Sequence, residues 1–470
     1  MPQNELAGNL AKPYYFENNM VVKLKIFVAI LLFFQLNCSS SREITEQSPA
    51  PEQMSEATEE KPLEAPIAVI IEEEPAPVEE PVSEPAEEAP IPPEEKATET
   101  GLKVGAERLE LYLPYLQGSQ GAALLVNQTS MVGNTHLVDT LLSLGVKVAK
   151  IFAPEHGFRG SADAGEKVRD GKDLETGLPI ISLYGSSRKP AAADLEGIDV
   201  VVFDVQDVGA RFYTYISSMH YVMEACAEQD VFFVVLDRPN PNGHYVDGPI
   251  LQKGYESFVG MHPVPIVHGM TVGEYAKMIY GEGWLAGGVK GEMEVIPCSG
   301  YTHNTSYELP VAPSPNLPNM RAIYLYPSIC FFEGTVASEG RGTPHQFQVY
   351  GHPDYPEGDY SFTPVSMPGA KYPKLEGQLC RGYSLVGRPP DSIRSEAKIN
   401  LSYLINFYRE FPDKDDFFLK NLFFDKLAGG PQLRRQIVAG KTEAEIRETW
   451  QEGLEAFREV RQKYLLYNSD

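Results

Sequence analysis

The sequence lacks the short motifs that mark several common classes of protein. No GxGxxG motif follows the first expected strand, and neither GxxxxGKS/T nor GxSxG occurs. Binding of a dinucleotide or nucleoside triphosphate, and serine-hydrolase chemistry, are therefore not supported. Cysteine is scarce, with five in 470 residues and no CxxC spacing. The four in the body are expected to be buried thiols, with one disulfide as the alternative: Cys226, Cys298, Cys330 and Cys380.

Basic residues are also few, with 40 Lys and Arg against 65 Asp and Glu and a net charge of -25. Most of this excess lies in residues 39–100, which hold 18 Glu against only Arg42, Lys61 and Lys96. The mildly acidic remainder is a poor match for phosphates, so we expect no nucleic-acid partner. Residues 39–102 are rich in Pro and Glu and are expected to form a disordered stalk, because they cannot bury enough apolar surface to offset chain entropy.

Long apolar runs are missing as well. The longest, Ile26–Phe34, is too short to span a bilayer and follows Lys23 and Lys25, which is the pattern of a signal peptide. Because Met20 directly precedes this pattern, we expect translation to start there rather than at Met1.

Cys38 lies shortly after the apolar run, in a segment that is similar to a bacterial lipoprotein cleavage box. Gln35 and Asn37 depart from the usual residues of that box. We expect residues 1–38 to be a signal peptide, Cys38 to be acylated, and the protein to be an exported, membrane-anchored lipoprotein, periplasmic or on the cell surface, at the outer membrane. An incidental thiol in an ordinary secretory signal is the alternative.

From residue 121 onward, short apolar segments alternate with helical patterns. Strands are expected over residues 122–127, 147–153, 180–184, 200–205 and 231–237. A crossover helix is expected over 212–228, and apolar strands separated by helices indicate a mostly parallel sheet covered on both faces. We predict an α/β fold with a mostly parallel α/β domain over 103–320 and a smaller C-terminal α+β domain over 321–470, which ends in one helix over 442–464.

Polar segments follow three of these strands, where parallel sheets bind ligands. With later segments they form an ordered set of motifs: Glu155–Gly160, Asp204–Tyr215, Asp237–Pro241 with Gly248 and Pro249, His268–Thr271, Pro313–Pro318, and Glu333–Thr335 with Gly340–Thr343. The set resembles the exo-acting β-N-acetylmuramidases over residues 103–468. The resemblance implies a Rossmann-like catalytic domain, a cleft between it and the C-terminal domain, and release of N-acetylmuramic acid from the non-reducing end of peptidoglycan fragments.

Cleavage of a glycoside requires a carboxylic acid that protonates the leaving oxygen. Glu155 is the first candidate, because it follows a strand and lies between Pro154 and Gly157, where a carboxyl group would be fixed and partly desolvated. His156 is expected to position Glu155 or to bind a sugar hydroxyl. The alternative is a structural ion pair between Glu155 and Arg159.

A second carboxylate, or the 2-acetamido group of the substrate, must stabilise the oxocarbenium-like centre. The candidates are Asp204 and Asp207, which lie at and just beyond the end of a strand, and Glu333, which lies in a glycine-containing loop. Glu166 is a weaker fourth. The sequence leaves this choice open.

N-acetylmuramic acid carries a lactyl carboxylate, which the planar fork of an arginine can bind with two hydrogen bonds. The candidate cations are Arg159, Arg211 and Arg341, and the alternative for each is a pair with a nearby acid. Tyr213 is expected to offer a ring face to the sugar, and Asp237 is a further candidate for substrate binding.

Two other functions stay open. A metal-dependent hydrolase would use His156, Asp204, Asp207 and Asp237, but the HxH and HExxH spacings are missing. A non-catalytic lipoprotein that binds cell-wall fragments would keep the cleft and the arginines without a general acid. We expect no metal and no cofactor, and we expect MurNAc-GlcNAc fragments of peptidoglycan and a membrane as partners.

Overall fold

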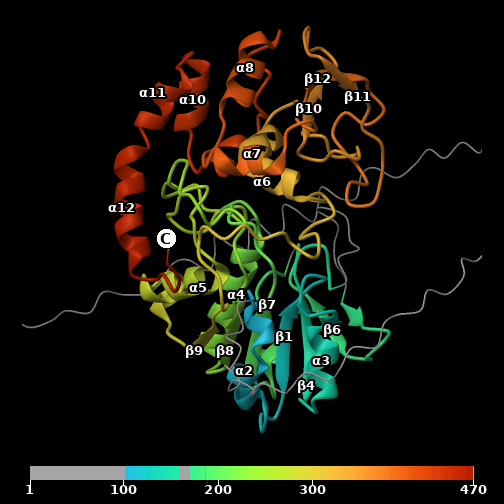
Figure 1. Cartoon of the computed structure of the whole chain (residues 1–470), viewed down its shortest axis with the longest axis vertical. Helices are drawn as coiled ribbons and strands as arrows, with labels where there is room; N and C mark the ends of the chain where they lie inside the picture. Colours follow the sequence, from blue (N-terminus) through green and yellow to red (C-terminus); the bar gives the residue numbers. More distant parts are fainter. Residues whose placement is uncertain (1–100, 159–169, 186, 469–470) are drawn as a thin grey trace, which may run out of the picture. The chain divides into compact units, whose positions relative to one another are not determined.

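The computed structural model describes residues 101–158, 170–185 and 187–468. A seven-stranded sheet forms the centre of the first half of the body (Figure 1). Its strands are, in spatial order, β5 (Gly171–Lys172), β6 (Pro179–Ser182), β4 (Val148–Ala153), β1 (Ala122–Val126), β7 (Val200–Asp204), β8 (Phe232–Leu236) and β9 (Met293–Ile296). All neighbouring strands are parallel except the edge pair β5 and β6. The five expected strands are confirmed.

Helices cover both faces of this sheet. Successive side chains of a buried strand point to opposite faces, so apolar residues on both faces need a covering layer. Leu124 packs in a cluster with residues of α2 (Leu109–Leu116) and α3 (Leu137–Ser143). The next residue, Leu125, packs in a different cluster with residues of α4 (Tyr215–Glu228) and α5 (Val272–Gly281). The remaining short elements of this region are η1 (Gly105–Glu107), the hairpin of β2 (Met131–Val132) and β3 (Thr135–His136), η2 (Ala192–Leu195) and η3 (Ala286–Gly288).

The C-terminal region contains a three-stranded antiparallel sheet and a group of helices. The sheet has the order β10 (Val349–His352), β12 (Cys380–Ser384), β11 (Tyr360–Phe362). The helices are α6 (Met320–Ile329), η4 (Cys330–Gly334), α7 (Pro390–Ser395), α8 (Ser402–Glu410), α9 (Phe423–Ala428), α10 (Gln432–Val438), α11 (Glu443–Glu448) and α12 (Gln451–Gln462). The predicted fold class, a mostly parallel α/β region followed by a smaller α+β region, is confirmed.

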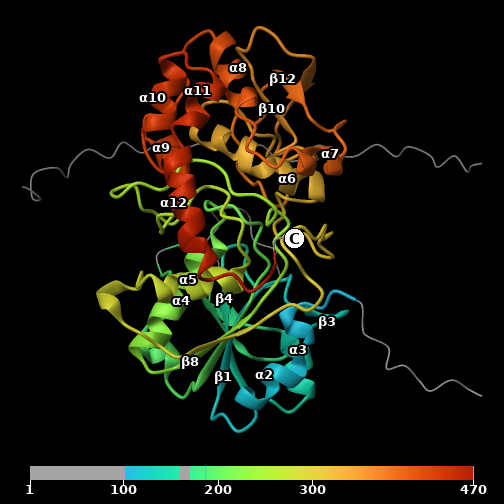
Figure 2. The same ribbon diagram turned by 60° about the vertical axis from the view of Figure 1, so that its left-hand side comes forward.

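The end of the chain returns to the first region. Tyr464 packs on Gly281 at the end of α5, and α12 lies next to α5 in both ribbon views (Figures 1 and 2). The hydroxyl of Tyr467 donates to Asp237 Oδ2 at 2.6 Å. The expected single helix over 442–464 is instead two helices, because the chain turns between α11 and α12 where Trp450 is buried.

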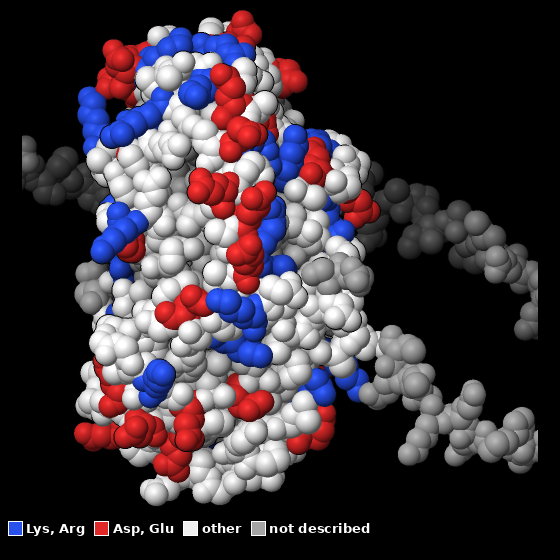
Figure 3. All heavy atoms as spheres, turned by 90° about the vertical axis from the view of Figure 1, so that its left-hand side faces the viewer, with Lys and Arg blue, Asp and Glu red and all other residues white. Residues whose placement is uncertain are grey.

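Several features predicted from the sequence can be compared with the described residues. The four cysteines of the body are free and buried, as predicted. None of the helices within the described ranges has both the length and the apolar character to cross a membrane. The face in Figure 3 carries interspersed acidic and basic side chains, so this face offers no continuous basic track to a polyanion. The predicted signal peptide, Cys38 and the predicted stalk as far as residue 100 lie outside the described residues.

Candidate active site

A cavity of ≈ 520 Å³ lies at the carboxyl ends of the parallel strands and is bordered on the other side by the C-terminal region. Its wall comes from segments far apart in the sequence: Glu155 and His156 after β4, Tyr184 and Arg188 after β6, Phe212–Tyr215 before and at the start of α4, Ser257–Val259, Ser314–Leu317, Tyr326 of α6, Glu333 of η4, Arg341, Phe347, and Phe423 and Lys426 of α9. This position agrees with the rule that open parallel sheets bind ligands beyond their strand ends.

Glu155 enters the cavity from the turn that ends β4. The turn is closed by a hydrogen bond from the Gly157 amide to the Pro154 carbonyl at 3.0 Å, and both His156 and Gly157 have a positive φ. A positive φ is costly for histidine, so the surrounding structure holds this backbone in place.

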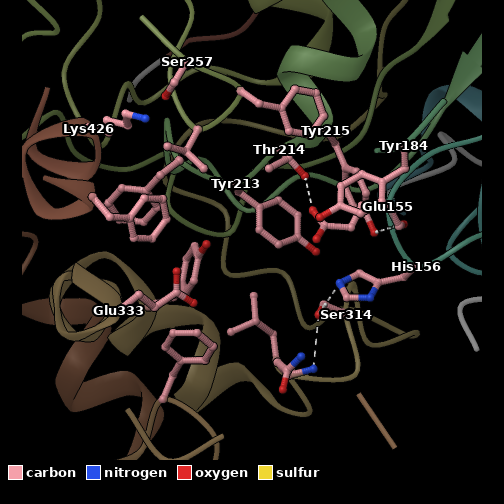
Figure 4. A pocket seen from close by; sticks show the side chains of 18 of the residues that line it. Glu155, His156, Tyr184, Tyr213, Thr214, Tyr215, Ser257, Ser314, Glu333 and Lys426 are labelled. Atoms are coloured by element: carbon pink, nitrogen blue, oxygen red, sulfur yellow. Dashed lines mark hydrogen bonds between the residues drawn. The ribbon is translucent and has the colours of Figure 1, made fainter. Parts of the chain in front are cut away.

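The carboxyl group of Glu155 has two hydroxyl neighbours. Thr214 Oγ1 donates to Glu155 Oε2 at 2.7 Å, and the Tyr184 hydroxyl also forms a hydrogen bond with the Glu155 side chain. Burial, followed by the charge of Glu155 and this hydrogen bond, raises the pKa of Tyr184, so the phenol keeps its proton and acts as the donor. These contacts fix the orientation of the carboxyl group relative to the cavity (Figure 4).

His156 is buried in the wall of the cavity beside Glu155. Its Nε2 lies 3.3 Å from Ser314 Oγ, and Ser314 also accepts from the Asn316 amide at 3.1 Å. The Pro-rich segment Pro313–Pro318 therefore forms part of the wall. His156 is close enough to the cavity to contact a bound ligand.

Glu333 lies at the other end of the cavity from Glu155 and His156 (Figure 4). Its Oε1 accepts from Arg341 Nη2 at 2.5 Å, and Arg341 Nε lies 3.4 Å from Glu339 Oε1. Burial opposes the charge of Arg341, but these two carboxylates together raise its pKa. Arg341 is thus matched by acids of the protein itself.

Tyr213 contributes to the aromatic part of the wall. Its hydroxyl donates to the Pro313 carbonyl at 2.9 Å, and its ring meets the ring of Tyr215 edge to face, with centroids 4.9 Å apart. Tyr326 and Phe347 add further rings to the wall. Such surfaces suit the apolar face of a sugar ring.

Asp207 lies behind this wall rather than on it. Its Oδ2 accepts from the Gly209 amide at 2.6 Å, whereas Oδ1 is buried and has no hydrogen-bond partner among the described residues. Burial raises the pKa of Asp207 to about 7, against the opposing effect of the backbone hydrogen bonds. The prediction that Asp207 belongs to the cavity is therefore not supported by its position.

Asp204 was also expected at the site, and its position corrects that expectation. It is fully buried and forms a two-pronged ion pair with Arg238, with Nε to Oδ1 at 2.6 Å and Nη2 to Oδ2 at 2.9 Å. A buried carboxylate requires such a partner, and the pair leaves no oxygen facing the cavity. Asp204 supports the loops behind the strand ends.

Arg211 and Asp237 require the same correction. Arg211 is fully buried and donates to the carbonyls of Pro249, Val264 and Leu427 at 2.8, 2.7 and 2.9 Å. Asp237 is fully buried as well, and its carboxylate accepts hydrogen bonds from three groups: Thr271 Oγ1 at 2.7 Å, the Gly273 amide at 2.8 Å and the Tyr467 hydroxyl at 2.6 Å. Both side chains connect distant segments, and neither lines the cavity.

The structure thus brings five of the predicted residues together and adds others. The five are Glu155, His156, Tyr213, Glu333 and Arg341. Their roles stay predictions, and Arg159, like Glu166, lies outside the described residues. The sequence analysis did not identify Tyr184, Arg188 or Lys426 as site residues. The strand-end rule could have found the first two, since Tyr184 ends the expected strand over 180–184 and Arg188 follows it.

The residues suggested for a metal site are not arranged for that purpose. Asp204 and Asp237 are occupied by the partners described above, and His156 lines the cavity without them. Within the ranges that the structure describes, no three His, Cys, Asp or Glu side chains are grouped to hold an ion.

Comparison with known proteins identifies relatives over the whole body. The model "Exo-beta-N-acetylmuramidase NamZ, N-terminal" matches residues 122–321, and the corresponding C-terminal model matches 324–467. The peptidoglycan β-N-acetylmuramidase NamZ of Bacillus subtilis (strain 168) is 38% identical over 338 residues, which is 68% of this chain and 80% of the relative.

Two crystal structures of DUF1343 family proteins from Bacteroides fragilis NCTC 9343 are also similar. The first is 49% identical, with a TM-score of 0.73, over 79% of this chain and 100% of that chain. The second is 28% identical, with a TM-score of 0.66, over 78% of this chain and 99% of that chain.

Proposed function

The chain belongs to the exo-β-N-acetylmuramidase family, and we propose that it is a glycoside hydrolase that releases N-acetylmuramic acid from the non-reducing end of peptidoglycan fragments. The observation that carries this proposal is the position of Glu155. Its carboxyl group lies at the end of a parallel strand, inside a cavity large enough for a sugar, and is oriented by Thr214.

Glu155 acts as the general acid. In the transition state the anomeric carbon acquires oxocarbenium character while the leaving oxygen accepts a proton. The hydrogen bond from Thr214 restricts rotation of the carboxyl group, so that it stays directed at the cavity. The neighbouring His156 and the aromatic wall with Tyr213 hold the sugar against it.

Glu333 supplies the second carboxylate. Apart from Glu155, it is the only carboxyl side chain among the described residues of the wall, and the two lie at opposite ends of the cavity (Figure 4). Arg341 fixes the Glu333 carboxylate through its ion pair. From this position Glu333 directs either the attacking water or the 2-acetamido group of the substrate towards the anomeric carbon.

We further propose that the protein is exported and held at the outer membrane through acyl chains on Cys38. Lys23 and Lys25, the apolar run after them and the position of Cys38 support this proposal. Each buried CH2 group of an acyl chain contributes about 0.8 kcal/mol, so more than one chain gives stable anchoring without a spanning helix. Globomycin treatment of expressing cells should cause the unprocessed precursor to accumulate; a processed, soluble protein would contradict the anchor.

The experiment that tests the activity is product analysis by mass spectrometry. The purified protein is incubated with a disaccharide that has N-acetylmuramic acid at its non-reducing end, with and without a chelator. We expect free N-acetylmuramic acid in both cases, its loss in Glu155→Gln, and its retention in Glu459→Gln, which makes the same change at an exposed residue of α12. Binding of the disaccharide without cleavage would instead identify a non-catalytic binding protein.

A further inference from the structure

The cavity presents positive charge that the described residues of the protein do not neutralise in full. Three cations line it, namely Arg188, Arg341 and Lys426. Arg341 is paired with Glu333 and lies near Glu339. In the part of the chain that the structure describes, Arg188 and Lys426 form no ion pair with a carboxylate. An unpaired cation in a ligand cavity favours an anionic group on the ligand.

Arg188 is held in position by an aromatic ring. Its guanidinium carbon lies 4.3 Å from the centroid of the Phe258 ring. Phe258 sits at the tip of a tight turn, in which the amides and carbonyls of Ser257 and Gly260 pair at 2.8 and 3.0 Å. Stacking on a ring face leaves the in-plane N–H donors of a guanidinium free for another partner.

Arg188 also lies near the general acid. Tyr184, four residues earlier, forms a hydrogen bond with Glu155, and its ring lies 6.1 Å from that of Phe258. The charges of Glu155 and Arg188 both act on the pKa of Tyr184, the former raising it and the latter lowering it. Arg188 and Glu155 therefore lie at the same end of the cavity, so a sugar whose glycosidic oxygen contacts Glu155 is also close to Arg188.

We propose that Arg188 binds the lactyl carboxylate of N-acetylmuramic acid and so selects this sugar over N-acetylglucosamine. The inference rests on the proposed function, because it names the residue that determines the specificity of the same site. The two sugars differ by the lactyl ether alone, and its carboxylate matches the arginine fork. Arg341 is already matched by acids, and Arg211 is fully buried by its three carbonyl acceptors.

Lys426 is the matched control, because it lines the same cavity without a carboxylate partner among the described residues, but at the end opposite Glu155 (Figure 4). The substrates are p-nitrophenyl N-acetyl-β-muramide with a free lactyl carboxylate, and the same glycoside with that group converted to its methylamide. The measured quantity is the ratio of kcat/KM for the acid to kcat/KM for the amide. This ratio isolates recognition of the charge from the chemistry of cleavage.

We expect Arg188→Gln to lower this ratio by roughly 10- to 100-fold, as for loss of a hydrogen-bonded charge pair. Lys426→Gln should leave the ratio close to that of the unmodified protein. Arg188→Lys, which keeps the charge but not the fork or the stacking, should give an intermediate value. An unchanged ratio in Arg188→Gln, or an equal fall in both Gln variants, would overturn the assignment.

Calorimetric binding of N-acetylmuramic acid and of N-acetylglucosamine separates this inference from the proposed function. If the unmodified protein binds N-acetylmuramic acid but cleaves neither glycoside, the enzyme proposal fails, and the Arg188 assignment is still decided by whether Arg188→Gln loses that binding. If the unmodified protein binds both sugars equally, the assignment fails even when cleavage is observed. Equal thermal unfolding midpoints of all variants control for loss of the fold.

Discussion

Asp207→Asn should change how the free energy of unfolding depends on pH. The difference in this free energy between the variant and the unmodified protein should shift in favour of the variant when the pH is raised from 5 to 8. Asp207 is buried behind the cavity wall, with Oδ2 bonded to the Gly209 amide and Oδ1 unpartnered among the described residues. Burial raises its pKa from the ordinary 3.8 to about 7. Asparagine keeps an acceptor for the Gly209 amide and cannot ionise.

The sign follows from proton linkage. Between pH 4 and 7 the folded state keeps the Asp207 proton while the unfolded state releases it, so this residue lowers the free energy of unfolding as the pH rises. At about 1.4 kcal/mol per pKa unit, the change between pH 5 and pH 8 is about 2–3 kcal/mol. A fixed cost from placing an amide at the Oδ1 position is the same at both pH values and cancels.

The assay is urea unfolding of both proteins at pH 5, 6.5 and 8. Other groups titrate in both proteins, so the difference between the two free energies of unfolding reports on Asp207 alone. We expect this difference to shift in favour of the variant by about 2–3 kcal/mol from pH 5 to pH 8. Parallel pH profiles would refute the reasoning, because they would mean that Asp207 is ionised throughout this range.

Two further substitutions test the support of the site. Thr214→Val removes the donor to Glu155 Oε2 and should lower kcat/KM by about tenfold or more, while the thermal unfolding midpoint stays unchanged. An activity equal to that of the unmodified protein would show that this hydrogen bond does not orient the Glu155 carboxyl group. Arg238→Met leaves the buried carboxylate of Asp204 unpaired and should cost roughly 3–5 kcal/mol in chemical unfolding. A cost below about 1 kcal/mol would contradict a buried, charged pair.

The order of apolar and polar segments in the chain was enough to predict where Glu155, the proposed general acid, lies. Apolar β-branched segments separated by helical patterns specify a parallel sheet, and such a sheet collects its strand ends on one edge. Glu155 directly follows the strand over 148–153, so its neighbourhood could be read from local order alone. The same logic placed Tyr213 near the start of α4. Glu333, although 178 positions further along, could be nominated only through its glycine-containing motif.

Which polar side chains face the cavity and which support it became clear only from the packing of distant segments. Arg211 and Asp237 lie in segments that come after strands, as Glu155 does, but their partners are Leu427 and Tyr467, 216 and 230 positions away. Arg188 had no distinguishing motif, and its significance depends on the ring of Phe258. A charged group near a strand end is either satisfied by the protein or left for a ligand, and the sequence cannot show which, because that depends on contacts made after distant segments pack together.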